Sequence, residues 1–300
     1  MSMATKDHAT ANAGEVSGLS NLVRRLFAPN PSPYTYTGTG SFLVGHDSIA
    51  VIDPGPAIST HVDNLGAAAC NGSITHIFVT HTHVDHSPAA VLLKEKTGAT
   101  IYGFGPHGRS NDAEDEDTFV EEGVDLKFEP DIHIADGEIV KTGEWTIQAL
   151  HTPGHTSNHM CFVLREEKCV FTGDHVMGWA TSVISPPDGN MADYMHSLER
   201  LMARDDIIYR PTHGPAIENP QDHVASLIKH RKEREALIMA AVKDGKTSLP
   251  DITTSAYASV PKGLHRAAAR SALAHLIFLT EKGQITMKGH GANAFFTPHA

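Results

Sequence analysis

Residues 80–86 read Thr80-His-Thr-His-Val-Asp-His86 and place four potential metal ligands within six residues. The apolar run Ile77-Phe-Val79 precedes this segment, and an Ala- and Leu-rich run that ends at Gly98 follows it. This order predicts a buried strand, a ligand-bearing turn and a helix over 88–97. Functional residues are concentrated in such turns between strands and helices.

The spacing within this segment suits metal binding. Imidazoles two residues apart share one side of an extended chain, so His81 and His83 can bind one ion. Asp85 and His86 lie where the chain turns into the helix and can face a second ion. Asp85 could instead act only as a helix cap, but that leaves the three histidines unexplained.

Three more potential ligands each follow a predicted strand. They are His155 in His151-Thr-Pro-Gly-His-Thr156, Asp174 in Phe171-Thr-Gly-Asp174 and His213 in Pro211-Thr-His-Gly214. If these strands and strand 77–79 share a sheet and a direction, the four turns meet at one edge and their ligands converge.

The ordered motifs H-x-H-x-D-H, T-P-G-H-T, G-D and T-H-G resemble the metallo-β-lactamase superfamily over residues 35 to 215. The resemblance implies the α/β class and an αββα sandwich with two zinc ions. It assigns His81, His83 and His155 to the first zinc, Asp85, His86 and His213 to the second, and Asp174 to a bridge between them.

Asp53, in Val51-Ile-Asp-Pro-Gly55, has two interpretations. Asp-Pro-Gly is a common turn sequence. The superfamily resemblance instead implies an acidic residue here that supports the metal-binding histidines from behind. Three other histidines lie beside the motifs, and we expect them to support the ligands or to be buried: His151, His159 and His175.

The end of the chain predicts a second, smaller unit. Helical patterns over 223–242, 252–258 and 264–279 precede a strand over 283–288, which is the order of a winged helix. We therefore expect an N-terminal arm over 1–30, a catalytic domain over 31–222 and a winged-helix-like domain over 223–300. Length, motif spacing and this tail resemble the lactamase-beta-like subgroup, which includes an endoribonuclease.

Composition excludes several classes of protein. The 300 residues are 40% hydrophobic and 20% charged, without an apolar run long enough to cross a bilayer. The polar N-terminus lacks the features of a secretory signal, so we expect a cytoplasmic protein. A homo-oligomeric state is compatible with the sequence. Three cysteines without C-x-x-C spacing argue against a disulfide framework or a thiolate zinc site.

The expected activity is hydrolysis of a small-molecule ester, thioester, lactam or lactone. Two divalent ions lower the pKa of a shared water, so that a metal-bound hydroxide is available at neutral pH. Asp85 or Asp174 could accept a proton in the reaction. One alternative is cleavage of single-stranded RNA, which the net charge of −11 opposes. The other is iron-dependent persulfide dioxygenation, which needs one metal ion rather than two.

Segments outside the motifs give weaker predictions. The acidic run 112–117 is expected to be a solvated loop, while Trp179 and Tyr194 are candidates to line the substrate mouth. Arg231 lies among acidic residues of the helix over 223–242, which favours ion pairs within that helix. Arg231 could instead point toward an anionic part of the substrate.

Overall fold

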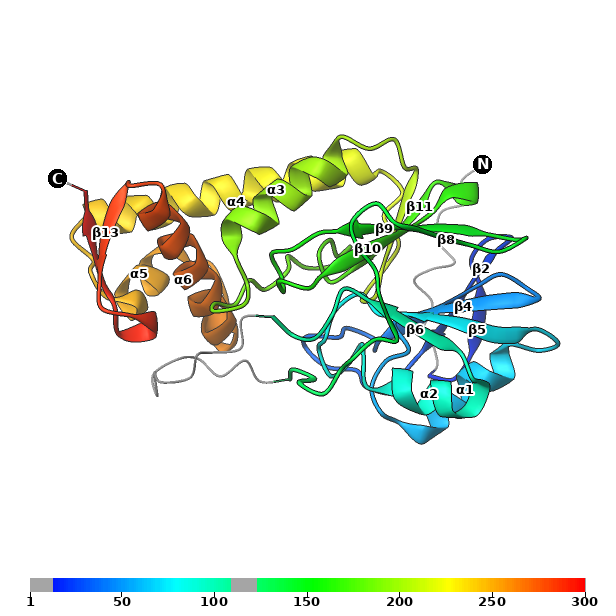
Figure 1. Cartoon of the computed structure of the whole chain (residues 1–300). Coiled ribbons are helices and arrows are strands. Elements are labelled where there is room, and N and C mark those ends of the chain that lie inside the picture. The colour runs from blue at the N-terminus through cyan, green and yellow to red at the C-terminus, as the bar shows by residue number, and fades with distance from the viewer. Residues whose placement is uncertain (1–12, 109–122, 300) are drawn as a thin grey trace.

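The computed structural model describes residues 13–108 and 123–299. They form two β-sheets packed face to face, with helices on the outer face of each sheet and a smaller unit beyond one end (Figure 1). The predicted α/β class and αββα sandwich are confirmed. The acidic run 112–117 and residues 1–12 of the predicted arm lie outside the described residues.

The first sheet has seven strands in chain order: β1 (Val16–Gly18), β2 (Val23–Phe27), β3 (Gly40–Val44), β4 (Ser48–Ile52), β5 (Ser73–Phe78), β6 (Thr100–Gly103) and β7 (Ile132–His133). β1 to β4 pair antiparallel, whereas β4 to β7 pair parallel. Parallel neighbours need crossover connections. Helix α1 (Ser59–Ala68) connects β4 to β5, and helix α2 (Ala89–Thr97) connects β5 to β6.

The second sheet has five strands in the order β12-β11-β10-β9-β8. Their bounds are β8 (Ile139–Lys141), β9 (Thr146–His151), β10 (Met160–Leu164), β11 (Cys169–Gly173) and β12 (Ile208–Pro211). β10 is antiparallel to both neighbours and β12 is parallel to β11, so β9, β11 and β12 run in one direction.

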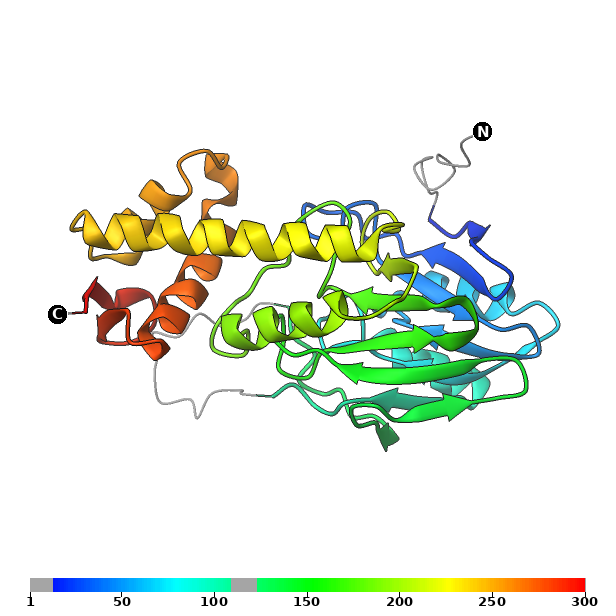
Figure 2. The same cartoon turned by 90° about the horizontal axis from the view of Figure 1, so that it is seen from above.

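Alternate side chains of the central strands enter different cores. Phe42 and Val44 of β3 pack between the sheets, whereas Leu43 packs beneath α1 and α2. β10 behaves likewise, with Phe162 between the sheets and Val163 facing α3 (Met191–Met202) and α4 (Pro220–Lys243). Because successive residues of a strand point to opposite faces, strands covered on both faces are apolar throughout. Figure 2 shows α3 and α4 lying across the second sheet.

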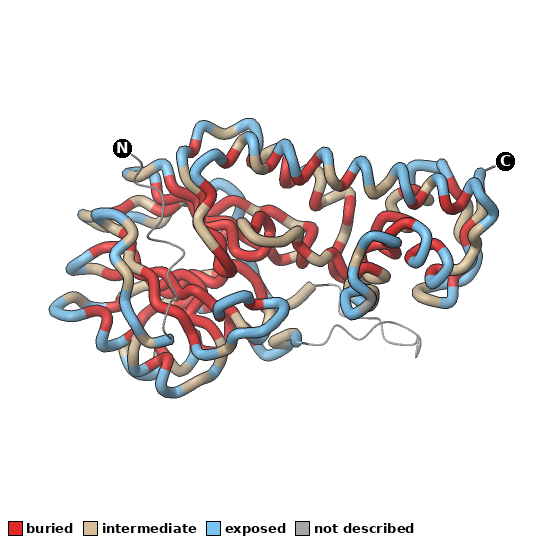
Figure 3. Tube along the Cα trace, turned by 180° about the vertical axis from the view of Figure 1, so that it is seen from behind, coloured by how far each residue is buried: buried red, intermediate tan, exposed pale blue. Residues whose placement is uncertain are grey.

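The smaller unit contains α5 (Leu249–Ala256), α6 (His265–Glu281) and the hairpin of β13 (Ile285–Lys288) and β14 (Phe295–Pro298). Helix α4 connects it to the sandwich and contributes to both cores. Its first half packs Val224 and Leu227 against the second sheet, and its second half packs Ile238 and Val242 against α5 and α6. Figure 3 shows the outer face of α4 exposed along its length. The predicted winged-helix-like tail is therefore present.

Two sequence predictions differ from the structure. Residues 23–27 are not part of an arm but form β2, an interior strand of the first sheet. The four ligand-bearing turns do not follow strands of one sheet, since β5 belongs to the first sheet and β9, β11 and β12 to the second. Within the described ranges, no helix is long and apolar enough to span a bilayer.

Candidate metal centre

Backbone hydrogen bonds hold the four ligand-bearing turns together at one end of the sandwich. The Met160 amide donates to the Thr80 carbonyl over 2.7 Å and so joins the first sheet to the second. The Gly40 amide donates to the Thr212 carbonyl over 2.9 Å and makes a second link between them. Ligands that come from two sheets therefore converge because main-chain bonds fix the turns that carry them.

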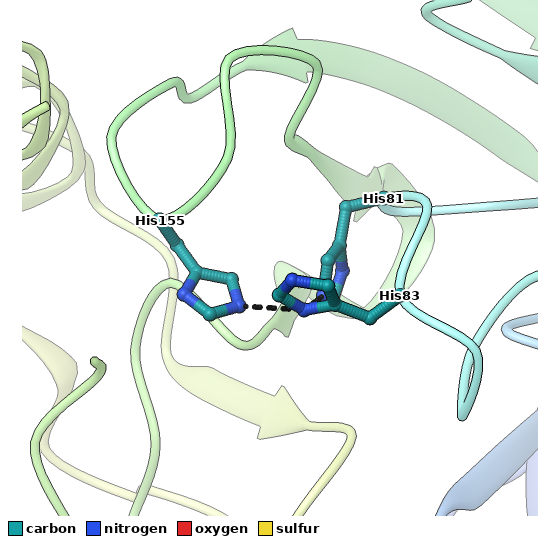
Figure 4. A group of neighbouring side chains, drawn as sticks. All are labelled: His81, His83 and His155. Carbon is teal, nitrogen blue, oxygen red and sulfur yellow. Dashed lines mark hydrogen bonds between the residues drawn. The ribbon is translucent and has the colours of Figure 1, made fainter. Parts of the chain in front are cut away.

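His81, His83 and His155 form the first group of potential ligands. Nδ1 of His83 lies 2.8 Å from Nε2 of His81 and 3.1 Å from Nε2 of His155. Figure 4 shows the three rings pointing toward one another from two different loops. Three imidazole nitrogens within 4.8 Å of one another are the donor set that Zn²⁺ and related ions take in proteins.

Asp85, His86 and His213 form the second group. Nε2 of His213 lies 3.1 Å from Oδ2 of Asp85 and 3.3 Å from Nε2 of His86. Both histidines are completely buried, whereas the side chain of Asp85 is 23% exposed. This group therefore reaches solvent on the side of Asp85.

The carboxylate of Asp174 lies between the two groups. Its Oδ1 is 3.6 Å from Nε2 of His86 and 3.5 Å from Nε2 of His213, whereas its Oδ2 is 3.9 Å from Nε2 of His155. Oδ1 is buried and has no hydrogen-bond partner in the described part of the chain. A buried carboxylate oxygen without a partner is costly, so a cation between the groups would supply the interaction that it lacks.

The outer nitrogens of four histidines are fixed by acceptors. Nδ1 of His155 lies 2.7 Å from the Val183 carbonyl, and Nδ1 of His213 lies 3.3 Å from the Gly38 carbonyl. Since a carbonyl only accepts, each Nδ1 carries a proton and each Nε2 is left as the ligand atom. In the same way, Nδ1 of His81 lies 3.0 Å from the Thr80 hydroxyl, and Nδ1 of His86 lies 2.9 Å from a carboxylate oxygen of Asp53.

Asp53 supplies that carboxylate and joins three parts of the site. It accepts hydrogen bonds from the Thr80 amide and hydroxyl, both 2.8 Å, from Nδ1 of His86, 2.9 Å, and from the Thr212 hydroxyl, 2.7 Å. The side chain is completely buried. Sequence reasoning missed both threonines, although each directly precedes a ligand, in Thr80-His81 and Thr212-His213.

The electrostatics of the site favour bound cations. Burial opposes ionisation of Asp85 and Asp174, yet the neighbouring histidines His86 and His213 hold the pKa of both carboxyls below their usual range. Burial likewise opposes charge on His86, but the carboxylates of Asp85, Asp174 and Asp53 raise its pKa well above the usual value. The carboxylates therefore keep their negative charge, and a metal ion could replace the protons that balance it.

The remaining histidines of the motifs lie outside the donor groups. Nδ1 of His159 is 2.9 Å from the Thr152 hydroxyl, and its Nε2 accepts from the Asp174 amide over 3.3 Å. His151 donates to the Ser157 carbonyl over 2.9 Å. Thus His159 fixes the backbone of Asp174, and His151 fixes the turn that carries His155.

The structure also places the candidates for the substrate mouth. Trp179 is half-buried beside the loop of His213, whereas Tyr194 is fully buried and donates to the His175 carbonyl over 3.2 Å, so Tyr194 is a core residue rather than a mouth residue. Arg231 is buried and donates to the Ser182 carbonyl over 2.5 Å, rather than pairing with acids of its own helix. The Ser182 hydroxyl donates in turn to the Asp174 carbonyl. Helix α4 thereby contacts the loop of a potential ligand.

Curated relatives cover most of the chain. It is 30% identical over 263 residues to a beta-lactamase-like protein 2 homolog of Caenorhabditis elegans, across 84% of this chain and 82% of that one. It is 29% identical over 236 residues to an atrochrysone carboxyl ACP thioesterase of Cryptosporiopsis sp., across 78% of this chain and 66% of the relative. A second such thioesterase, from Paecilomyces divaricatus, is 28% identical over 259 residues.

Solved structures share the fold over nearly the whole chain. A beta-lactamase domain protein from Burkholderia ambifaria superposes with a TM-score of 0.77 at 19% identity, covering 95% of this chain and 94% of that one. A metallo-beta-lactamase family protein from Thermus thermophilus gives the same TM-score at 20% identity, covering 94% and 100%.

Two parts of the chain match known protein families. Residues 36–213 match the metallo-beta-lactamase superfamily, and residues 248–292 match the beta-lactamase-associated winged helix domain. The first match contains every residue of the donor groups. The chain therefore belongs to the metallo-beta-lactamase superfamily, as a hydrolase of that type with a C-terminal winged helix domain.

Proposed function

We propose that the protein is a dinuclear zinc-dependent hydrolase of a small-molecule thioester. The observation that carries the proposal is the position of Asp174, whose two oxygens face two separate donor groups. In this assignment His81, His83 and His155 hold one ion, Asp85, His86 and His213 hold the other, and Asp174 contacts both. Two zinc ions, when bound, would activate water and polarise the scissile carbonyl group.

The protein's own groups would orient the reaction and move its proton. Asp85 is more exposed than Asp174, with 23% against 13% of the side chain accessible, so its carboxylate lies nearer the incoming substrate. We assign to the Asp85 carboxylate the role of accepting the proton that is released as water adds to the carbonyl. Asp53 and His159 would hold the ligand loops in position, since their bonds reach His86 and the Asp174 amide.

The thioester is the preferred substrate class because several curated relatives bear the name of acyl-carrier-protein thioesterases. Oxygen esters, lactams and lactones share the same reaction at a carbonyl group and follow as alternatives. A net charge of −11 disfavours RNA, which proteins bind largely through basic residues. A cytoplasmic location, a homo-oligomeric state and a domain boundary at residues 222–223 stay predictions.

A substrate panel tests the proposal. Zinc-loaded protein is assayed on an acyl thioester, an oxygen ester, a lactam, a lactone and a short single-stranded RNA. We expect the thioester to give the highest kcat/KM, and chelation of the metal to abolish the reaction. Cleavage of RNA alone, or thioester hydrolysis that survives complete removal of metal, would contradict the proposal.

A ligand variant and a matched control locate the activity. His83→Ala should lower kcat/KM by more than about 100-fold, since loss of a supporting group alone costs a metal site about 10- to 100-fold. His133→Ala serves as the control because His133 is exposed on β7 and lies outside the donor groups. Circular dichroism should show both variants folded. Equal activity of the two variants would remove His83 from the site.

A further inference from the structure

Two aromatic side chains lie beside the second donor group. The rings of Tyr36 and Trp179 have centroids 5.1 Å apart and planes inclined at 31°. Trp179 packs against the residue after His213, because a Cβ added to Gly214 would lie 2.5 Å from Cδ1 of the indole. Gly38, two residues after Tyr36, accepts the hydrogen bond from Nδ1 of His213. Both rings therefore belong to loops that hold this ligand.

The pair does not have the features of ordinary core residues. Tyr36 is 45% exposed, and its φ of 57° lies in the left-handed region, which is unfavourable for a bulky side chain. Nε1 of Trp179 is buried and has no hydrogen-bond partner among the residues described. Strained backbone and unsatisfied donors persist mainly at functional sites. The surrounding structure thus holds an exposed aromatic surface in place next to a potential metal ligand.

More apolar surface adjoins the other ligands. Val84 is 44% exposed although it lies between His83 and Asp85 in the chain. The Val84 amide donates to the Gly123 carbonyl over 2.8 Å, so the segment that begins at Gly123 runs beside the ligand loop. Leu126 of that segment is 69% exposed. The ligand loop and the segment beside it therefore carry exposed apolar side chains.

We propose that Tyr36 and Trp179 bind the acyl group of the substrate and select a planar, apolar acyl group, such as an aromatic one. The inference rests on the proposed thioester hydrolysis and adds to it the class of acyl group. An aromatic ring gains from offset or edge contacts with other rings in addition to the area that it buries. Val84 and Leu126 add exposed apolar side chains on the ligand loop and on the segment beside it.

The test compares two thioesters with the same leaving group, benzoyl- and acetyl-N-acetylcysteamine. The wild-type protein should prefer the benzoyl substrate, and Tyr36→Ala and Trp179→Ala should each reduce the benzoyl-to-acetyl ratio of kcat/KM by about 10-fold, mainly through a higher KM. Phe295→Ala is the control, since Phe295 is also an exposed aromatic residue, with 58% exposure against 45% for Tyr36, and lies on β14. A ratio that changes equally in all three variants would overturn the inference.

A binding measurement separates this inference from the proposed function. The chain has two tryptophans, and Trp145 is buried between the sheets with 1% exposure. Titration of the zinc-loaded protein with the benzoyl amide analogue of the substrate should change the tryptophan fluorescence of the wild type. The change should disappear in Trp179→Phe, which keeps a ring but leaves Trp145 as the emitter.

The outcomes of the two experiments are distinguishable. A fluorescence change that depends on Trp179, in a protein that hydrolyses neither thioester, would sustain the aromatic site and refute thioester hydrolysis. Hydrolysis of both thioesters at equal kcat/KM, without any change of fluorescence, would sustain the proposed function and refute the aromatic site.

Discussion

The hydrogen bonds of Asp53 make a quantitative prediction possible. Its carboxylate accepts from Nδ1 of His86 and from the hydroxyl groups of Thr80 and Thr212 through the same oxygen, Oδ2. Asp53→Asn replaces one oxygen by an amide nitrogen, and Oδ1 can still accept from the Thr80 amide. The two hydroxyl groups can rotate and accept, but the ring nitrogen of His86 cannot, because its hydrogen then faces another donor.

The expected cost falls on metal binding. Removing the acceptor behind a ligating histidine costs about 10- to 100-fold in metal affinity, which corresponds to about 1.4 to 2.8 kcal/mol. Asparagine tolerates the left-handed backbone of this position, where φ is 50°, so backbone strain adds little. We therefore expect one of the two ions to bind about 10- to 100-fold more weakly in Asp53→Asn.

Competition with a chromogenic zinc chelator measures both affinities. Asp206→Asn is the matched control, because Asp206 is buried and paired with Arg204 beyond the donor groups. The control should lose stability toward urea but keep both zinc affinities. If Asp53→Asn bound two zinc ions as tightly as the wild type, the support that we assign to Asp53 would be refuted.

Further predictions concern stability, pH and metal removal. Gly154→Ala should destabilise the fold strongly, because the added Cβ would lie 2.3 Å from the backbone of Tyr194. Gly66→Ala places its Cβ in open space on α1 and should stabilise the protein by about 0.5 to 1 kcal/mol. Urea unfolding measures both changes. Burial lowers the pKa of His275 to about 3 and that of His61 to about 4, against 6.5 when unfolded. As the pH falls from 6.5 toward 4, only the unfolded chain gains these protons. The free energy of unfolding should therefore fall by up to about 1.4 kcal/mol per pH unit for each of the two histidines. His275→Leu should make this fall shallower in urea titrations, and an unchanged slope would contradict it. Chelation should lower the Tm in a manner that zinc at about 100 times its Kd reverses, because ligand binding at that concentration contributes about 2.7 kcal/mol; a Tm indifferent to zinc would contradict it.

The closeness of His81, His83, Asp85 and His86 could be predicted because their pattern is local. His81 to His86 lie within one turn, and short-range geometry alone brings such side chains together. The assignment of His155 rather than His151 or His159 depended on the family pattern. In the structure, a backbone acceptor at Val183 directs Nε2 of His155 toward His83, and such a contact leaves no trace in the sequence.

The strand β2 could not be predicted from the sequence because its polar residues have structural roles. Arg24 and Arg25 make β2 look like a solvated arm, yet Arg24 donates to the Gly45 carbonyl over 2.8 Å, and Arg25 is buried over the ring of Phe27. The division of strands between two sheets was equally out of reach, since strand pairing depends on contacts distant in sequence. The contact of Arg231 with Ser182 spans 49 residues and shows the same limit.

In the proposed function, two zinc ions share the site through Asp174. Anomalous X-ray diffraction at the zinc absorption edge, from crystals of the zinc-loaded protein, tests this arrangement. We expect two anomalous peaks, one among His81, His83 and His155 and one between His86 and His213, with Asp174 beside both. A single peak among the three histidines, or a signal at the iron edge from the protein as purified, would contradict it.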